Sequence, residues 1–202
     1  MIPRLYAITD ASAGLSHVEQ VERFARGGAG WVQVRDKHAG ARALYEIVVA
    51  ALAVARPLGV KLIVNDRVDV ALAADADGAH VGQEDVPADA AREILGPGRI
   101  VGVSTHSTEQ ARAASRLDVD YVAIGPVFAT STKENPDPVV GLAGVAAARA
   151  VVARPLVAIG GITLERAPSV IAAGADSVAV VSDLAAGGSI EARVSEYVAA
   201  LG

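Results

Sequence analysis

The 202-residue sequence contains no cysteine, and aromatic residues make up only 3% of it. Without cysteine, structural disulfides, thiolate nucleophiles and cysteine-based zinc sites are excluded, so the chemistry must use other groups. Hydrophobic residues nevertheless amount to 52%. The core must therefore consist of Ala, Val, Leu and Ile, a composition typical of α/β proteins whose parallel strands are covered on both faces.

The chain also lacks an excess of positive charge. Its formal net charge is −5, whereas a general affinity for nucleic acid or for an anionic membrane needs a basic surface. We therefore expect small-molecule partners, with any anionic ligand held by local cationic groups. The sequence indicates no particular oligomeric state.

Long apolar runs are missing as well. Residues 1–10 contain no basic stretch followed by an apolar run, and no apolar stretch approaches the length that spans a bilayer. We therefore expect a soluble, cytoplasmic protein. The length suits one domain over residues 1–202, because no linker or low-complexity tract divides the chain.

Strand-like runs alternate with Ala-rich amphipathic stretches along the whole chain. We predict eight strands, over residues 5–9, 31–34, 61–65, 78–81, 100–104, 121–124, 155–159 and 177–181. Helices are clearest over residues 16–26, 41–55, 108–115 and 142–152. This alternation implies parallel strands, and eight repeats favour a closed (β/α)₈ TIM barrel over an open doubly wound sheet.

The ends of the predicted helices carry capping residues. Ser16 followed by Glu19 predicts a capping box, and Thr108 is predicted to cap the helix that it begins. Four glycines are expected to end helices in the left-handed conformation: Gly28, Gly59, Gly174 and Gly202. The longer loops are expected after the second, fourth and sixth strands.

Polar residues cluster where strands end, which in such a barrel is the face that carries the reacting groups. After the second strand, the period of two sends Gln33, Arg35 and Lys37 to one side, while Val32 and Val34 pack outward. One amide and two cations at one spot would anchor a diphosphate. A solvated loop with ordinary surface charges is the alternative.

Two carboxylates follow neighbouring strands. Asp66 comes directly after the third strand, and Asp85 lies in the turn after the fourth. Such a pair suits Mg²⁺, which takes one or two carboxylates together with phosphate oxygens and waters. For each residue alone, a turn or cap role is the alternative.

A second anion site is predicted on the opposite arc of the barrel. The loop over residues 125–133 offers hydroxyls and a lysine, Gly160 and Gly161 follow the seventh strand, and Ser182 follows the eighth. Loops after the last two strands form the frequent phosphate site of such barrels. Each motif alone also fits a simple tight or polar turn.

The four histidines receive no catalytic role. His80 lies within an apolar strand and is expected to be a hydrogen-bonded packing residue. His17 and His38 are expected to face solvent, and His106 to lie near the mouth of the barrel.

With these residues in view, the chain resembles the thiamine phosphate synthase family along nearly its whole length. The order and spacing of eight segments are specific as a set, although each is weak alone: Tyr6–Asp10, Gln33–Lys37, Asn65–Arg67, Ala76–Asp85, Gly102–His106, Gly125–Lys133, Ala158–Ile162 and Ala179–Ser182. One departure is Arg166, where the family often has Asn; it is expected on the helix that follows.

The resemblance implies a Mg²⁺-dependent enzyme that joins 4-amino-2-methyl-5-(diphosphooxymethyl)pyrimidine to 4-methyl-5-(2-phosphoethyl)thiazole or its carboxylated precursor. Departure of diphosphate would leave a positive charge on the pyrimidine methylene, which the ring amino group delocalises and the thiazole nitrogen traps. Such an enzyme mainly neutralises the leaving diphosphate and aligns the nucleophile.

The same resemblance implies roles for individual residues. Pyrimidine diphosphate would bind at Gln33, Arg35, Lys37, Asn65, Ser104 and Lys133, with Val34 and Asp36 in the same segment. Thiazole phosphate would bind at Thr130, Ser131, Thr132, Gly161, Val181 and Ser182. Mg²⁺ would be held by Asp66 and Asp85. The catalytic groups would be Arg35, Lys37, Ser104 and Lys133.

Two other functions are compatible with such a barrel. A thiazole tautomerase of the same superfamily usually has a histidine after the glycine that follows the sixth strand, where this chain has Pro126. A non-catalytic phosphate-binding barrel would not need Asp66, Asp85, Arg35 and Lys133 together. Both are therefore less favoured than the synthase.

Overall fold

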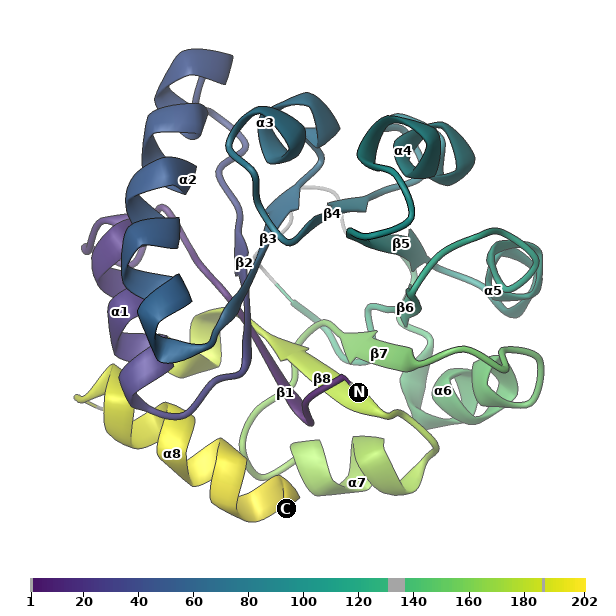
Figure 1. Ribbon diagram of the computed structural model, residues 1–202. Coiled ribbons are helices and arrows are strands. Elements are labelled where there is room, and N and C mark those ends of the chain that lie inside the picture. Colours follow the sequence, from purple (N-terminus) through teal and green to yellow (C-terminus); the bar gives the residue numbers. More distant parts are fainter. Residues whose placement is uncertain (1, 131–136, 187) are drawn as a thin grey trace.

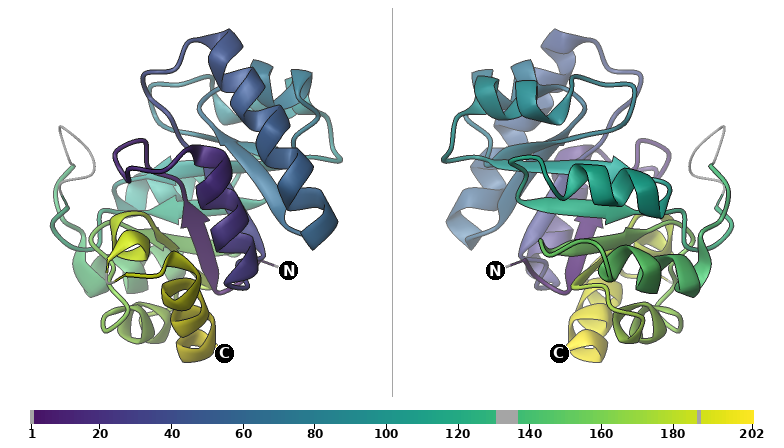
Figure 2. Two further views of the ribbon diagram at one scale, coloured as in Figure 1. Left: turned by 90° about the vertical axis from the view of Figure 1, so that its left-hand side faces the viewer. Right: turned by 90° about the vertical axis from the view of Figure 1, so that its right-hand side faces the viewer.

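The computed structural model, which describes residues 2–130, 137–186 and 188–202, is a closed barrel of parallel strands surrounded by helices (Figure 1). Each strand pairs with the next along the chain, and β1 pairs with β8 to close the ring. The predicted (β/α)₈ TIM barrel is therefore confirmed. Side views place the N-terminus at the face where the strands begin (Figure 2).

The strands are short and the helices vary in length. The strands are β1 (Leu5–Ile8), β2 (Trp31–Val34), β3 (Lys61–Asn65), β4 (Gly78–Val81), β5 (Ile100–Thr105), β6 (Tyr121–Ile124), β7 (Leu156–Ile159) and β8 (Ser177–Val180). The α-helices are α1 (His17–Arg26), α2 (Ala41–Ala55), α3 (Val68–Ala73), α4 (Ala88–Leu95), α5 (Thr108–Ala114), α6 (Gly141–Arg149), α7 (Ala167–Ala172) and α8 (Ile190–Leu201). Two 3₁₀ helices are η1 (Arg56–Leu58) and η2 (Ser182–Ala185). Within the described ranges, none of the helices combines the length and apolar character needed to cross a bilayer.

The predicted helix ends are mostly confirmed. Ser16 and Glu19 form the capping box of α1, and the four expected glycines all have positive φ. The cap of α5 was predicted one residue too late, because the hydroxyl of Ser107, not of Thr108, accepts the N–H of Gln110. The connection between β1 and α1, residues 9–16, is also longer than expected.

Two apolar layers hold the fold together. The outer layer fills the space between strands and helices and includes Val32 and Val34, which point outward as the strand period predicts. The inner layer fills the barrel, where Tyr6, Trp31 and Tyr121 meet edge-to-face with ring centroids 5.8–5.9 Å apart. A chain poor in aromatic residues thus places three of them inside the barrel.

Gly102 on β5 makes this interior arrangement possible. A Cβ built on Gly102 would lie 2.0 Å from the ring of Tyr121, and one on Gly78 would lie 2.1 Å from the carbonyl oxygen of Ile100. Because both contacts are far inside van der Waals distance, these strands need glycine for packing rather than for a special backbone conformation.

We expect Gly102→Ala to destabilise the fold, since the ring of Tyr121 has no free space into which to retreat. Overpacking of this kind costs about 1–3 kcal/mol or more. Gly98→Ala is the matched control, because a Cβ there meets nothing within 4 Å. Urea unfolding should show a lower midpoint for the first variant alone, and equal midpoints would contradict the packing role of Gly102.

Candidate active site at the mouth of the barrel

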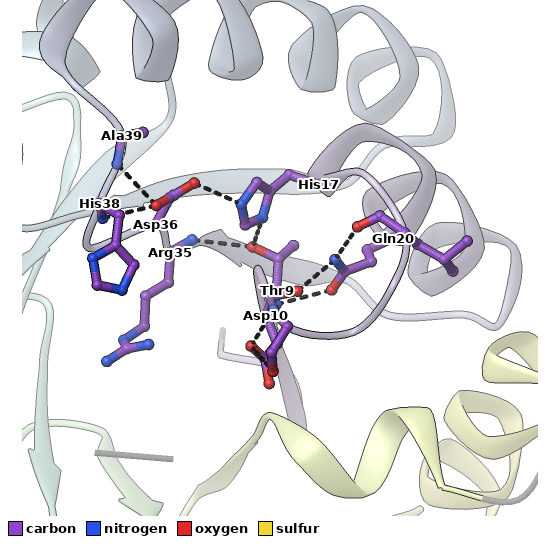
Figure 3. A network of polar contacts seen from close by, with 10 residues as sticks. Thr9, Asp10, His17, Gln20, Arg35, Asp36, His38 and Ala39 are labelled. Atoms are coloured by element: carbon purple, nitrogen blue, oxygen red, sulfur yellow. Dashed lines mark hydrogen bonds and ion pairs between the residues drawn. The ribbon is translucent and has the colours of Figure 1, made fainter. Parts of the chain in front are cut away.

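The predicted diphosphate anchor lies at the end of β2. Gln33 is buried in the barrel, and its amide nitrogen donates to the hydroxyl of Tyr6 over 2.9 Å. The half-buried guanidinium of Arg35 makes no hydrogen bond or ion pair to any described residue, and Figure 3 shows it turned away from Asp36. Lys37 Nζ lies 2.5 Å from Asp66 Oδ2. Among the described residues of this anchor, Arg35 is therefore unpaired and Lys37 is already paired with a carboxylate.

A buried polar network fixes the backbone that carries Arg35 (Figure 3). The imidazole of His17 contacts Thr9 Oγ1 at 2.7 Å and Asp36 Oδ2 at 3.2 Å. Thr9 Oγ1 in turn accepts the backbone N–H of Arg35 at 3.1 Å. The prediction that His17 faces solvent was wrong, because its ring is buried between Thr9, which follows β1, and Asp36, which follows β2. His38 is exposed, as predicted.

Two residues of the predicted substrate segment serve the protein itself. Val34 is 0% exposed within the outer layer, so its side chain does not reach the mouth. Partial burial disfavours the charged form of Asp36, but the N–H groups of His38 and Ala39, together with His17, outweigh it and lower the pKa of this carboxyl. Asp36 is therefore a charged anchor of the loop after β2.

The two predicted metal ligands lie together. Burial raises the pKa of Asp66, and the adjacent carboxyl of Asp85 adds to the effect, whereas Lys37 opposes it. Asp66 has a φ of 63°, a conformation unfavourable for a non-glycine residue, and its N–H donates to the carbonyl of His80 at 2.7 Å. Asp85 Oδ2 accepts the N–H of Gly82 at 2.8 Å. Backbone hydrogen bonds thus hold the two carboxyl groups close together, although their negative charges repel each other.

This pair fits a hard cation. Two carboxylates that repel each other in a partly buried place are the oxygen donors that Mg²⁺ uses, with phosphate and water completing its shell. The described residues contain no group of three or more His, Cys, Asp or Glu side chains suited to a metal. The donor set is therefore too small for a metal held by protein alone and fits one shared with an anionic substrate.

Asn65 and Ser104 lie near the ends of β3 and β5, the two strands that flank β4. Ser104 Oγ contacts His80 Nε2 at 2.8 Å, and its carbonyl accepts the amide of Gln83 at 2.6 Å, which ties the loop after β4 to β5. Asn65 is buried at the end of β3. His80 is a hydrogen-bonded packing residue, as predicted; its other ring nitrogen contacts the hydroxyl of Tyr121 at 2.9 Å.

The predicted second anion site lies after β7 and β8. Gly161 has a φ of 62°, and a Cβ there would lie 2.4 Å from the carbonyl oxygen of Ala129, so the loops after β6 and β7 touch. Val181 and Ser182 border a cavity of about 200 Å³ between η2 and the loop after β1. Arg166 precedes α7, contrary to the prediction that it lies on that helix; it bonds the carbonyl of Gly161 at 3.1 Å and covers the Phe128 ring.

The loop after β6 is described only in part. Thr130 is half-buried, whereas the predicted residues Ser131, Thr132 and Lys133 lie outside the described residues. His106 lies at the mouth, as predicted, and contacts the carbonyl of Gly125 at 2.7 Å and Asp137 Oδ2 at 3.4 Å. It therefore fastens both ends of this loop.

Comparison with known proteins identifies relatives that match almost the whole chain. Residues 5–184 match the family model described as thiamine monophosphate synthase. The thiamine-phosphate synthase of Koribacter versatilis is 49% identical over 193 residues, which cover 91% of this chain and 89% of the relative. That of Chloroflexus aurantiacus is 48% identical, covering 96% and 90%.

Solved structures agree with this assignment. Thiamine phosphate pyrophosphorylase from Pyrococcus furiosus has a TM-score of 0.89 and 38% identity, covering 98% of this chain and 97% of that one. A geranylgeranylglyceryl phosphate synthase from Thermoplasma acidophilum, with a TM-score of 0.72 and 16% identity, shares the fold alone.

The environment of His80 makes the stability of the protein depend on pH. Burial lowers its pKa from 6.5 to about 4, so between these values the unfolded chain binds a proton that the folded one rejects. The associated stability is fully present above pH 6.5 and is lost as the pH falls toward 4, by roughly 3 kcal/mol. Urea unfolding at several pH values should show a steeper loss for the parent than for His80→Gln. Equal slopes would contradict the buried neutral imidazole.

Proposed function

The chain belongs to the thiamine monophosphate synthase family, and we propose that it joins the aminopyrimidine diphosphate to the thiazole phosphate at the mouth of its barrel, releasing diphosphate. The observation that carries this proposal is the grouping of Arg35, Lys37, Asp66 and Asp85 at neighbouring strand ends. Such a mixture of cations and paired carboxylates suits a magnesium-bound diphosphate better than a simple phosphate. It therefore favours the synthase over a tautomerase, which needs no diphosphate site.

The proposed reaction is a substitution at the pyrimidine methylene. The bond from this carbon to the diphosphate oxygen breaks, the electron pair leaves with the oxygen, and the thiazole nitrogen donates its lone pair to form the new C–N bond. Mg²⁺ held by Asp66 and Asp85 would neutralise charge on the diphosphate. Arg35 would bind the same leaving group through its unpaired guanidinium.

The other residues bind and orient the partners of this reaction. Lys37 keeps a positive charge beside the carboxylates, and Ser104 offers a hydroxyl close by. Gly161, Val181 and Ser182, on the opposite arc, would bind the thiazole phosphate together with Thr130. Separate anion sites let the protein hold two like-charged substrates in line. Both substrates are phosphorylated, which fits a cytoplasmic enzyme.

The direct test is synthesis of thiamine phosphate from the two purified substrates, with and without Mg²⁺. We expect product only when both substrates and the metal are present. Conversion that is unaffected by excess chelator would contradict the metal requirement, and no product under any condition would contradict the function.

Arg35→Ala should weaken the binding of pyrimidine diphosphate far more than that of thiazole phosphate. Loss of a forked contact to phosphate costs on the order of 2 kcal/mol, or about 30-fold in the dissociation constant. Arg42→Ala is the control, because Arg42 lies on α2 with a 93% exposed side chain. Calorimetric titration of each substrate decides the point, and equal weakening of both would count against the assignment.

Mg²⁺ and pyrimidine diphosphate should bind with positive coupling, each raising the affinity of the other by the same factor. The reason is that two carboxylates supply only part of the shell of the metal. Asp85→Asn should abolish this coupling and most turnover, whereas Asp89→Asn on α4 should not. Titrations of each ligand with and without the other would show it, and unchanged coupling in Asp85→Asn would place the metal elsewhere.

A further inference from the structure

A continuous chain of hydrogen bonds crosses the interior of the barrel. Gln33 Nε2 donates to the hydroxyl of Tyr6 at 2.9 Å, and that hydroxyl lies 3.1 Å from the hydroxyl of Tyr121. The Tyr121 hydroxyl lies 2.9 Å from His80 Nδ1, and His80 Nε2 lies 2.8 Å from Ser104 Oγ. The chain thus begins and ends on residues predicted to bind the pyrimidine diphosphate, while its middle is buried protein.

The protons in this chain can be counted. Each tyrosine hydroxyl has one proton to donate, and the buried imidazole is neutral and has one N–H. Only two arrangements of the protons satisfy every hydrogen bond. In the first, each group donates to the next one along the path from Gln33 to Ser104. In the second, each group donates in the opposite direction, and the Gln33 amide is flipped so that its oxygen accepts from Tyr6. A mixed arrangement leaves a buried polar group unpaired, which costs about 1–3 kcal/mol. The direction at one end therefore fixes the direction at the other.

The two arrangements present opposite groups at the mouth. In the first, the Ser104 hydroxyl is free to donate, and the amide oxygen of Gln33 remains an acceptor. The amide oxygen of Gln33 has no hydrogen-bond partner among the described residues. Every fully buried side-chain nitrogen or oxygen of these residues has a partner, so the Gln33 oxygen is not fully buried and solvent reaches it. In the second, Ser104 gives its proton to His80, and the NH₂ group of Gln33 takes the place of the oxygen.

An anion at Ser104 selects between them. A phosphate oxygen accepts the Ser104 proton in the first arrangement but meets only lone pairs in the second. A diphosphate bound here therefore stabilises donation away from Gln33.

We propose that Tyr6, Tyr121 and His80 are positioning residues that couple diphosphate binding at Ser104 to the orientation of the Gln33 amide, and so make the site specific for a 4-aminopyrimidine. This proposal rests on the proposed function. An aminopyrimidine offers an amino donor next to a ring-nitrogen acceptor, which pairs with the amide oxygen and the remaining N–H of Gln33. A 4-oxopyrimidine offers the opposite pair and needs the reversed chain.

The test is the ratio of the dissociation constants of the 4-oxo and 4-amino pyrimidine diphosphates, measured by calorimetry with Mg²⁺ and without thiazole phosphate. Binding is measured because the oxo compound lacks the amino group that assists the reaction. The Tyr121→Phe variant keeps Gln33 and Ser104 but interrupts the chain of hydrogen bonds between them. The ratio should therefore fall about tenfold or more. The oxo compound should bind more tightly than it does to the parent, whereas general damage would weaken both ligands.

Further variants separate the possible outcomes. Ser104→Ala and Tyr6→Phe should lower the ratio as well, whereas Tyr197→Phe, which removes an equally buried hydroxyl bonded to Asp183 at 2.6 Å, should leave it unchanged. A parent-like ratio in Tyr121→Phe and Ser104→Ala would overturn the coupling. Failure of the parent protein to make thiamine phosphate would instead refute the proposed function.

Discussion

Hydrogen bonding between β1 and β8 closes the sheet, and the arrangement of the site depends on this closure. Because all eight strands are parallel, their carboxyl ends lie on one rim, and neighbouring rim positions come from consecutive strands. Asp66 and Asp85 meet there because β3 pairs with β4. The two predicted anion sites occupy different arcs, one built on β2–β5 and the other on β6–β8. An open sheet would leave these arcs at opposite edges.

Closure also creates an interior that side chains must fill. Gly102 leaves room in one part of the barrel, and Tyr121 occupies it. Burial of the Tyr121 hydroxyl without a hydrogen-bond partner would be costly, but this hydroxyl forms hydrogen bonds with Tyr6 and His80. The groups that fill the barrel therefore also connect Gln33 with Ser104 at its mouth.

The strands and the location of the site could be predicted from sequence, and the strand bounds differ from the structure by no more than one residue at either end. Each strand can be located from its own short apolar run. The rule that functional groups lie at the C-terminal ends of the strands needs only the order of the elements. The burial of His17 could not be predicted, because it depends on its contacts with the loops that follow β1 and β2. The contact between Tyr6 and Tyr121 depends on the stagger of strands 115 residues apart.

The remaining question is how a chain of net charge −5 would attract the two anionic substrates of the proposed reaction. Several of its other cations are paired with carboxylates: Arg149 lies 2.7 Å from Asp176, and Arg193 lies 2.8 Å from Asp183. Arg35 has no such partner among the described residues, and the nearby Asp36 carboxylate is occupied by backbone N–H groups and His17. A half-buried, uncompensated guanidinium focuses positive potential at the mouth even though the protein as a whole is acidic. Under the proposed function, the network around His17 would therefore assist binding without contacting substrate, because it holds the Asp36 carboxylate in place and Asp36 forms no ion pair with Arg35.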